Sequence, residues 1–187
     1  MNTTEFLNIT SLIVPDRTAI VFDGKRFSFQ ELEERIKRLA NALSGMGVGA
    51  GDRIATMQVN CNENIETYFA AAKLDAVYVP LNFRSRPEEI EYMINDSKPK
   101  VLITGERYVS MVDEIKAGLT SVDGFVVLDD ASAEGWESYE HLLSLSSDED
   151  FYPTGDEDDL TMVMFTAGTT GSPKGVMLSH DSFASYI

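Results

Sequence analysis

The residues of this 187-residue chain that could do chemistry gather in one short run near its C-terminal end, residues 165–175. The run reads FTAGTTGSPKG and combines three threonines, one serine, three glycines and one lysine. Glycines allow sharp turns and bring backbone N–H groups close to an anion, hydroxyl groups donate hydrogen bonds, and a lysine supplies a mobile positive charge. This composition predicts a loop that binds phosphate groups.

Two other interpretations of the run are a simple hairpin turn and a Walker-type P-loop. A hairpin fits, because apolar strands are expected over residues 160–165 and 176–178, but a hairpin does not exclude ligand binding. A P-loop does not fit, since its pattern G-x-x-x-x-G-K-[ST] needs glycine before the lysine and a helix after it. Here Pro173 precedes Lys174 and a strand is expected to follow.

The longer run over residues 160–180 closely resembles the signature phosphate loop of the AMP-forming adenylate-forming enzymes. This family includes acyl-CoA synthetases, luciferases and peptide-synthetase adenylation domains. Its typical form is YTSGTTGxPKGV, from which this chain departs at Phe165 and Ala167. The segments TAIVFDGKRFSFQEL, GVGAGDRIA and KLDAVYVPLNFRS resemble the same family, with Asp75 where glycine is usual. We interpret these other segments as scaffold, because none of them concentrates reactive groups.

The resemblance implies a two-step ligase that uses ATP, Mg²⁺ and CoA. A carboxylic acid attacks the α-phosphate of Mg-ATP to give an acyl-adenylate and pyrophosphate, and a thiol, commonly that of CoA, then takes the acyl group. The residues implied to hold the phosphates are Thr166, Ala167, Gly168, Thr169, Thr170, Gly171, Ser172 and Lys174. His180 is expected to pack at a strand end, with a ligand contact as the alternative.

The resemblance also implies that much of the enzyme lies outside these 187 residues. We find no Y-G-x-T-E motif, and expect an N-terminal fragment of an acyl-CoA synthetase of fatty acid metabolism, inactive alone and without catalytic or metal-binding residues of its own. Phe183 and Ile187 are expected to be exposed. Whether the chain forms a homodimer is left open. The alternatives are a fragment of a peptide-synthetase-type adenylation domain and a non-catalytic nucleotide- or phosphate-binding module.

The elements that must position the loop alternate between short β-rich runs and stretches with helical periodicity. Strands are expected at residues 18–22, 25–27, 53–58, 76–79, 100–104, 125–128 and 160–165. Helices are expected at residues 28–47, 63–74, 85–94 and 108–117. Because helices separate the buried strands, we predict parallel pairing with right-handed crossovers, hence a layered α/β fold with a largely parallel sheet.

Local signals fix several helix ends. Ser28 with Glu31 predicts a capping box, and Gly47 is expected to end that helix in a left-handed conformation. Ser85 with Glu88 predicts a second capping box. The glycines at 45, 47, 49 and 51 do not have the dinucleotide-binding spacing, so we interpret them as a cap and turn.

Charge and composition exclude some functions and divide the chain. A net charge of −16 disfavours nucleic acid and anionic membranes as general partners, and no apolar run approaches the ~20 residues of a membrane span. The single cysteine, Cys61, interpreted as a buried apolar side chain, fits a reducing, cytoplasmic location. We expect an α/β subdomain over 1–147, a solvated acidic linker over 148–159, and over 160–187 the phosphate-loop hairpin and the start of a truncated subdomain.

Overall fold

The computed structural model describes residues 2–128, 133–166 and 172–185. The strands are β1 (Thr18–Phe22), β2 (Lys25–Ser28), β3 (Arg53–Met57), β4 (Val77–Pro80), β5 (Val101–Thr104), β6 (Gly124–Val127), β7 (Glu137–Ser138), β8 (Leu160–Thr166) and β9 (Lys174–Ser179). The α-helices are α1 (Thr4–Ile13), α2 (Phe29–Gly45), α3 (Asn62–Lys73), α4 (Pro87–Ser97), α5 (Val109–Ile115), α6 (Tyr139–Leu145) and α7 (His180–Ala184). Short 3₁₀ turns at Glu106–Tyr108 and Lys116–Gly118 flank α5.

Seven strands form one sheet in the order β7-β6-β5-β3-β4-β8-β9, and β1 pairs with β2 in a separate antiparallel hairpin. Every neighbouring pair in the large sheet is parallel except β8 with β9. The predicted α/β fold with a largely parallel sheet is therefore confirmed. The strand order reverses at β3, because β4 lies on one side of it and β5 on the other.

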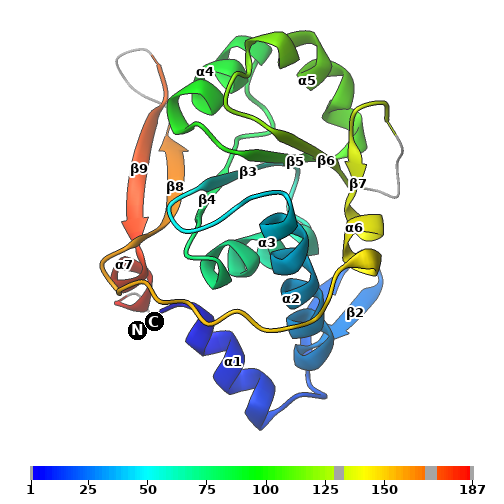
Figure 1. Cartoon of the computed structure of the whole chain (residues 1–187), viewed down its shortest axis with the longest axis vertical. Coiled ribbons are helices and arrows are strands. Elements are labelled where there is room, and N and C mark those ends of the chain that lie inside the picture. The colour runs from blue at the N-terminus through cyan, green and yellow to red at the C-terminus, as the bar shows by residue number, and fades with distance from the viewer. Residues whose placement is uncertain (1, 129–132, 167–171, 186–187) are drawn as a thin grey trace.

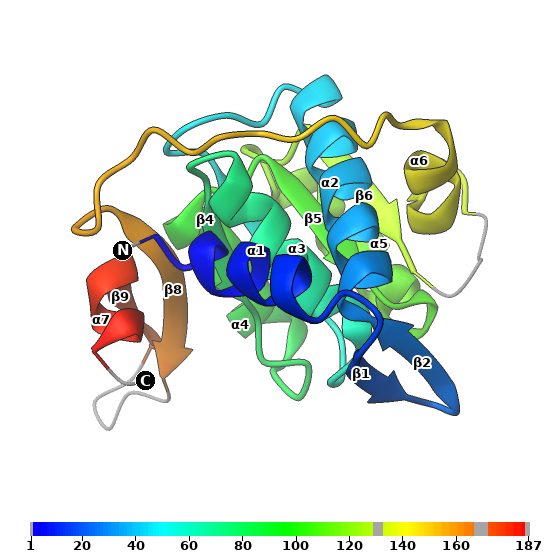
Figure 2. The ribbon, with the colours of Figure 1, turned by 90° about the horizontal axis from the view of Figure 1, so that it is seen from below.

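Helices cover both faces of the sheet. In Figure 1, α4 and α5 lie above the strands, whereas α1, α2 and α3 lie below them, and Figure 2 shows these three helices from underneath. Ile54 and Ile103 belong to the apolar cluster on the α2–α3 face, and Ala55 and Leu102 belong to the cluster on the α4–α5 face. Apolar side chains on both faces explain why the central strands are continuous apolar runs in the sequence.

Most of the predicted helix ends are found in the structure. Ser28 and Glu31 form the predicted capping box of α2, and Gly47 takes a left-handed backbone with φ +85° just after that helix. The prediction that Ser85 caps α4 is wrong. The helix begins at Pro87, so Arg86 is the N-cap, and its backbone N–H donates to Glu89 Oε2 at 2.9 Å. Proline favours the first helical position because it has no N–H to leave unpaired, and this shifts the cap by one residue.

The acidic segment over 148–159 packs along the helices instead of lying wholly in solvent. Asp150 Oδ1 lies 2.6 Å from Lys73 Nζ, and its other oxygen lies 3.4 Å from Lys37 Nζ. Although burial opposes ionisation, these two lysines hold the pKa of Asp150 below its ordinary value. The segment leads into β8, which joins the same sheet as β3 to β7. The division of the chain into subdomains stays a prediction.

Two further expectations concern the end of the chain. Phe183 is half-buried instead of exposed, because its ring packs 5.6 Å from that of Tyr68. Ile187 lies outside the described residues. Within residues 2–128, 133–166 and 172–185, no helix combines the length and the apolar character needed to cross a membrane.

Candidate functional site

The predicted phosphate loop is carried by the antiparallel hairpin of β8 and β9. Thr166 is paired with Lys174 at the base of the loop, and the Thr166 hydroxyl group donates to the Lys174 carbonyl oxygen at 3.4 Å. The side chains of Thr166, Ser172 and Lys174 are exposed. The other predicted site residues lie outside the described residues: Ala167, Gly168, Thr169, Thr170 and Gly171. The hairpin thus brings Thr166 and Lys174 together at the start of the loop.

Packing beneath the hairpin fixes where this loop begins. Val163 and Phe165 pack against the apolar cluster on the α4–α5 face, and β8 is parallel to β4 with Met162 opposite Tyr78. A Cβ atom on Gly175 would lie 3.0 Å from Val163, so glycine lets the two strands close over that side chain. The loop therefore leaves the sheet at the carboxyl end of β8, the edge at which open α/β sheets bind ligands.

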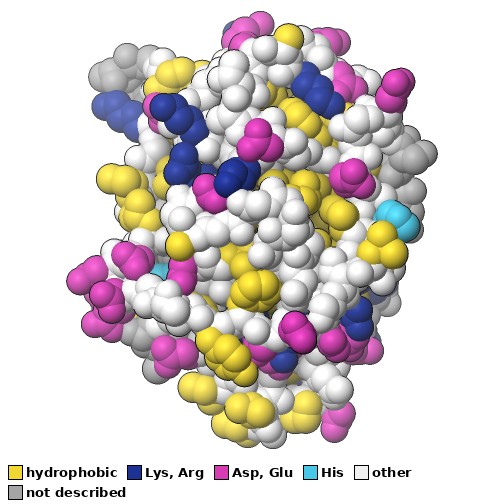
Figure 3. Space-filling model, in the orientation of Figure 1, with side chains coloured by type: hydrophobic (Ala, Val, Ile, Leu, Met, Phe, Trp, Pro, Cys, Tyr) yellow, Lys and Arg dark blue, Asp and Glu magenta, His cyan; other side chains and the backbone are white. Residues whose placement is uncertain are grey.

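One group of acidic side chains lies at the amino end of β8, away from the loop. Figure 3 shows acidic side chains gathered at the lower left, where the segment that precedes β8 runs in Figure 1. This segment enters the amino end of β8, and a strand of seven residues spans about 20 Å, roughly two and a half times the Debye length at physiological salt. Lys174, at the other end, has no ion pair with any described carboxylate. The local charge at the loop base is therefore positive despite the net charge of −16.

His180 performs the packing role that is expected of it. Its side chain is 2% exposed, and its Nδ1 lies 3.2 Å from the backbone N–H of Thr3 and 3.0 Å from the Thr3 hydroxyl group. Burial lowers the pKa of His180, against the opposing influence of Asp75 and Asp159. A neutral imidazole can accept the Thr3 N–H bond. The residue follows β9, at the opposite end of the hairpin from the loop, so it holds the base of the hairpin against α1.

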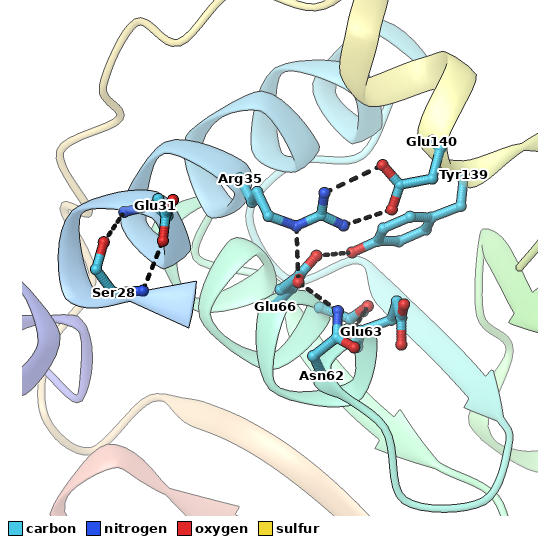
Figure 4. A network of polar contacts seen from close by, with 9 residues as sticks. Ser28, Glu31, Arg35, Asn62, Glu63, Glu66, Tyr139 and Glu140 are labelled. Atoms are coloured by element: carbon cyan, nitrogen blue, oxygen red, sulfur yellow. Dashed lines mark hydrogen bonds and ion pairs between the residues drawn. The ribbon is translucent and has the colours of Figure 1, made fainter. Parts of the chain in front are cut away.

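A buried polar cluster around Glu66 is invisible in the sequence. The carboxylate is fully buried and accepts hydrogen bonds from Arg35 Nε at 2.9 Å, Asn62 Nδ2 at 2.8 Å and Tyr139 OH at 2.8 Å. Arg35 also binds both oxygens of Glu140, at 2.6 and 3.0 Å (Figure 4). We call Arg35, Asn62, Glu66, Tyr139 and Glu140 the Glu66 cluster. It ties α2, α3 and α6 together.

Each charged group in the Glu66 cluster has a partner within the fold, with one cation, Arg35, shared by the carboxylates of Glu66 and Glu140. Burial favours the neutral form of Arg35, but hydrogen bonds and charge from Glu140 and Glu66 outweigh it and raise the pKa of the guanidinium group. Burial and the nearby Glu66 carboxylate raise the pKa of Tyr139, so the phenol stays a hydrogen-bond donor. The cluster is a structural device, since these groups already have partners.

Asp75, the departure from the usual glycine, anchors the acidic segment. Its backbone is left-handed with φ +53°, a conformation that costs most residues about 1–2 kcal/mol. Its carboxylate accepts hydrogen bonds from the backbone N–H groups of Thr154 at 2.8 Å and Gly155 at 3.2 Å. The side chain therefore gives this position a contact that glycine cannot make.

Cys61 is half-buried at the N-cap of α3, where burial and then the nearby Glu63 raise the pKa of its thiol to about 12. The thiol therefore stays protonated at neutral pH and is a poor nucleophile. Among the residues that the structure describes, no three His, Cys, Asp or Glu side chains are grouped so that they could hold a metal ion.

Comparison with known proteins places this hairpin in a family. Residues 13–187 match the family of AMP-binding enzymes. A long-chain-fatty-acid–CoA ligase of Thermus thermophilus is 37% identical over 155 residues, which cover 83% of this chain and 28% of that protein. An indoleacetate–CoA ligase of Aromatoleum aromaticum is 34% identical over 185 residues, which cover 98% of this chain and 36% of that protein.

The fold is also found in a solved structure. The anthranilate CoA ligase AuaEII, solved in complex with anthranoyl-AMP, superposes with a TM-score of 0.93 at 24% identity, over 96% of this chain and 35% of that one. This likeness shows a shared fold. The chain spans 28% and 36% of the lengths of the two ligases that it matches in sequence. Because the match runs over residues 13–187, the chain belongs to the AMP-binding enzyme family.

Proposed function

We propose that this chain carries the phosphate-binding hairpin of an ATP-dependent, AMP-forming carboxylate–CoA ligase. The observation that carries the proposal is the pairing of Thr166 with Lys174, which opens a loop of glycines and hydroxyl groups at the carboxyl end of β8. The two relatives compared in sequence are CoA ligases, which favours CoA over a peptide-synthetase carrier as the thiol acceptor. The substrate is then a carboxylic acid, and the single cysteine favours a cytoplasmic location.

In the proposed reaction, a carboxylate oxygen bonds to the α-phosphorus of ATP while the bond to the β-phosphate oxygen breaks. Pyrophosphate leaves, and negative charge grows on it. Mg²⁺ would enter with the nucleotide and offset part of this charge. The sulfur of CoA then bonds to the acyl carbon and gives up its proton to solvent, and AMP leaves with the electron pair of the broken bond.

The role of this chain is to hold the β- and γ-phosphates and to stabilise the departing pyrophosphate. The residues proposed for this role are Thr166, Ala167, Gly168, Thr169, Thr170, Gly171, Ser172 and Lys174. Lys174 adds a positive charge that is free of described carboxylates, and Thr166 adds a hydroxyl group at the same end of the hairpin. Fixed donors aimed at a growing charge lower the barrier, because they need no reorganisation when the charge appears.

The test measures carboxylate-dependent ATP–pyrophosphate exchange in the ligase that contains this chain. A charge-assisted hydrogen bond contributes about 1.5–3 kcal/mol, so Lys174→Ala is expected to slow exchange by roughly 10- to 100-fold. Lys174→Arg, which keeps the charge, is expected to lose less. Arg26→Gln, which removes an exposed cation from the other hairpin, serves as the matched control. Unchanged exchange in Lys174→Ala would remove the phosphate role.

A further inference from the structure

The two edges of the seven-stranded sheet are built differently. At one edge, β7 has only two residues and begins with the exposed Glu137. At the other edge, β9 has six residues and is the outermost strand at the left of Figure 1. An edge strand presents a row of backbone N–H and C=O groups that the sheet leaves unpaired, and proteins shorten or charge such strands to prevent pairing with another chain. The strand β7 is protected in this way.

The strand β9 has much less protection. After Lys174 it reads GVMLS, with no charged residue and no proline. Its register with β8 is regular from Met162 to Thr166, so no bulge twists the edge away over these residues. Val176 is 42% exposed and Met177 is 68% exposed. The edge therefore combines free backbone groups with exposed apolar side chains.

These two apolar side chains lie on opposite faces of the sheet. Directly opposite residues of an antiparallel pair share a face, and Met177 is paired with Val163, which packs on the α4–α5 face. Val176 is paired with Met164, so it lies on the other face. A strand added beside β9 would therefore contact an apolar side chain on each face as well as the free backbone groups.

The two ends of β9 differ in charge. The strand begins at Lys174, which has no ion pair with a carboxylate of the described residues. At its other end, the exposed Asp181 is the second residue after Ser179, and the His180 N–H donates to the carbonyl oxygen of the exposed Asp159 at 3.1 Å. An antiparallel partner strand should therefore be uncharged in the middle, positive where it begins and acidic where it ends. The strand β9 itself has these properties.

We propose that β9 pairs antiparallel with β9 of a second copy of this chain, which joins the two sheets into one. A two-fold axis perpendicular to the sheet keeps each side chain on its own face, so the uncharged residues 175–179 of the two copies lie side by side. The same axis places Lys174 of each copy near Asp159 and Asp181 of the other. The pairing does not depend on the proposed function, because it uses the edge of the sheet and requires no nucleotide.

The test measures the mass of the 187-residue chain by analytical ultracentrifugation over a series of concentrations. We expect a reversible monomer–dimer equilibrium. Met177→Lys places two positive charges close to the two-fold axis and is expected to weaken the dimer by roughly tenfold or more. The matched control is Met164→Lys, which adds the same charge at an exposed methionine of β8, away from the edge, and should leave the dimer unchanged. Asp181→Asn is expected to weaken the dimer roughly threefold.

Hydrogen exchange locates the interface. The backbone amides of β9 should exchange more slowly at high protein concentration than at low concentration. A chain that stays monomeric at every concentration would overturn the proposal and leave this edge to a different strand. A dimer that persists in Met177→Lys would assign the contact to another surface, and an equal loss in Met164→Lys would show a general effect of charge; either result also overturns it.

Discussion

The Glu66 cluster and the loop end of the β8–β9 hairpin use polar side chains in opposite ways. In the cluster, a carboxylate that is 0% exposed accepts three hydrogen bonds from Arg35, Asn62 and Tyr139. At the hairpin, Thr166 and Lys174 are exposed, and the lysine has no described carboxylate partner. The polar groups of the cluster already have hydrogen-bond partners within the fold. The polar groups at the loop end of the hairpin can still bond to a ligand.

The difference separates groups that hold the fold from groups that can hold a ligand. A buried charge is tolerated only when it is paired, so the Glu66 cluster must be satisfied internally and has little left to offer a substrate. An exposed lysine contributes little to stability, so Lys174 can offer its charge to a ligand at little cost to the fold. The predictions below test this separation, from the largest expected effect to the smallest.

Glu66→Ala is expected to give the largest loss of stability. It leaves the half-buried Arg35 without one of its two carboxylate partners and the Tyr139 hydroxyl group without its acceptor, and breaking a buried pair in this way costs about 3–5 kcal/mol. The free energy of unfolding in urea measures this loss. Glu66→Gln, which keeps the shape and one acceptor oxygen, should lose less. If both variants unfold like the wild type, the cluster does not hold the fold.

Asp75→Ala is expected to cost more than Asp75→Gly. Both variants lose the bonds from Thr154 and Gly155, but only alanine keeps the strain of the left-handed backbone, worth about 1–2 kcal/mol. The difference between their unfolding free energies isolates the backbone contribution. Equal stabilities would show that this position is not strained.

His180 is expected to make stability fall on acidification. Burial lowers the pKa of His180 from 6.5, so the unfolded chain takes up a proton in a pH range where the folded protein does not. The contribution of His180 to the free energy of unfolding is complete above pH 6.5 and is lost as the pH falls towards the folded-state pKa of this residue. Unfolding curves from about pH 7.5 to about pH 5 for wild type and His180→Gln measure the effect. Parallel pH profiles would contradict it.

Lys174→Ala is expected to give the smallest change in stability, within about 0.5 kcal/mol. The side chain is exposed and has no described ion pair, so its removal costs the fold almost nothing. Thermal unfolding of the 187-residue chain measures this. A loss above about 1 kcal/mol would mean that the lysine serves the fold, and the contrast with Glu66 would fail.

Much of the architecture is predictable because it depends on neighbours in the chain. Capping by Ser28 and the left-handed backbone of Gly47 each involve a few consecutive residues. The predicted cap of α4 is wrong by one residue, since the requirement of Pro87 outweighs the serine signal.

The sequence patterns predict neither the short strand β7 nor the helices α6 and α1. Helix α1 shows one reason. Its apolar side chains do not all face the core, because Ile9, Leu12 and Ile13 are exposed. Figure 3 shows apolar side chains gathered at the bottom of the molecule, where α1 lies in Figure 1. Exposed apolar residues weaken the amphipathic pattern by which a helix is found in a sequence.

The sequence by itself determined the composition of the phosphate loop and the strands that frame it, because glycines, hydroxyl groups and a lysine act within one short run of consecutive residues. Only the tertiary structure decided which charged side chains have a partner within the fold and which do not. Arg35 and Glu140 are 105 positions apart, and Gln58 and Arg107 line one recess because β3 and β5 are neighbours in the sheet. Such pairings depend on how the strands are ordered in the sheet, and no local pattern of residues encodes that order.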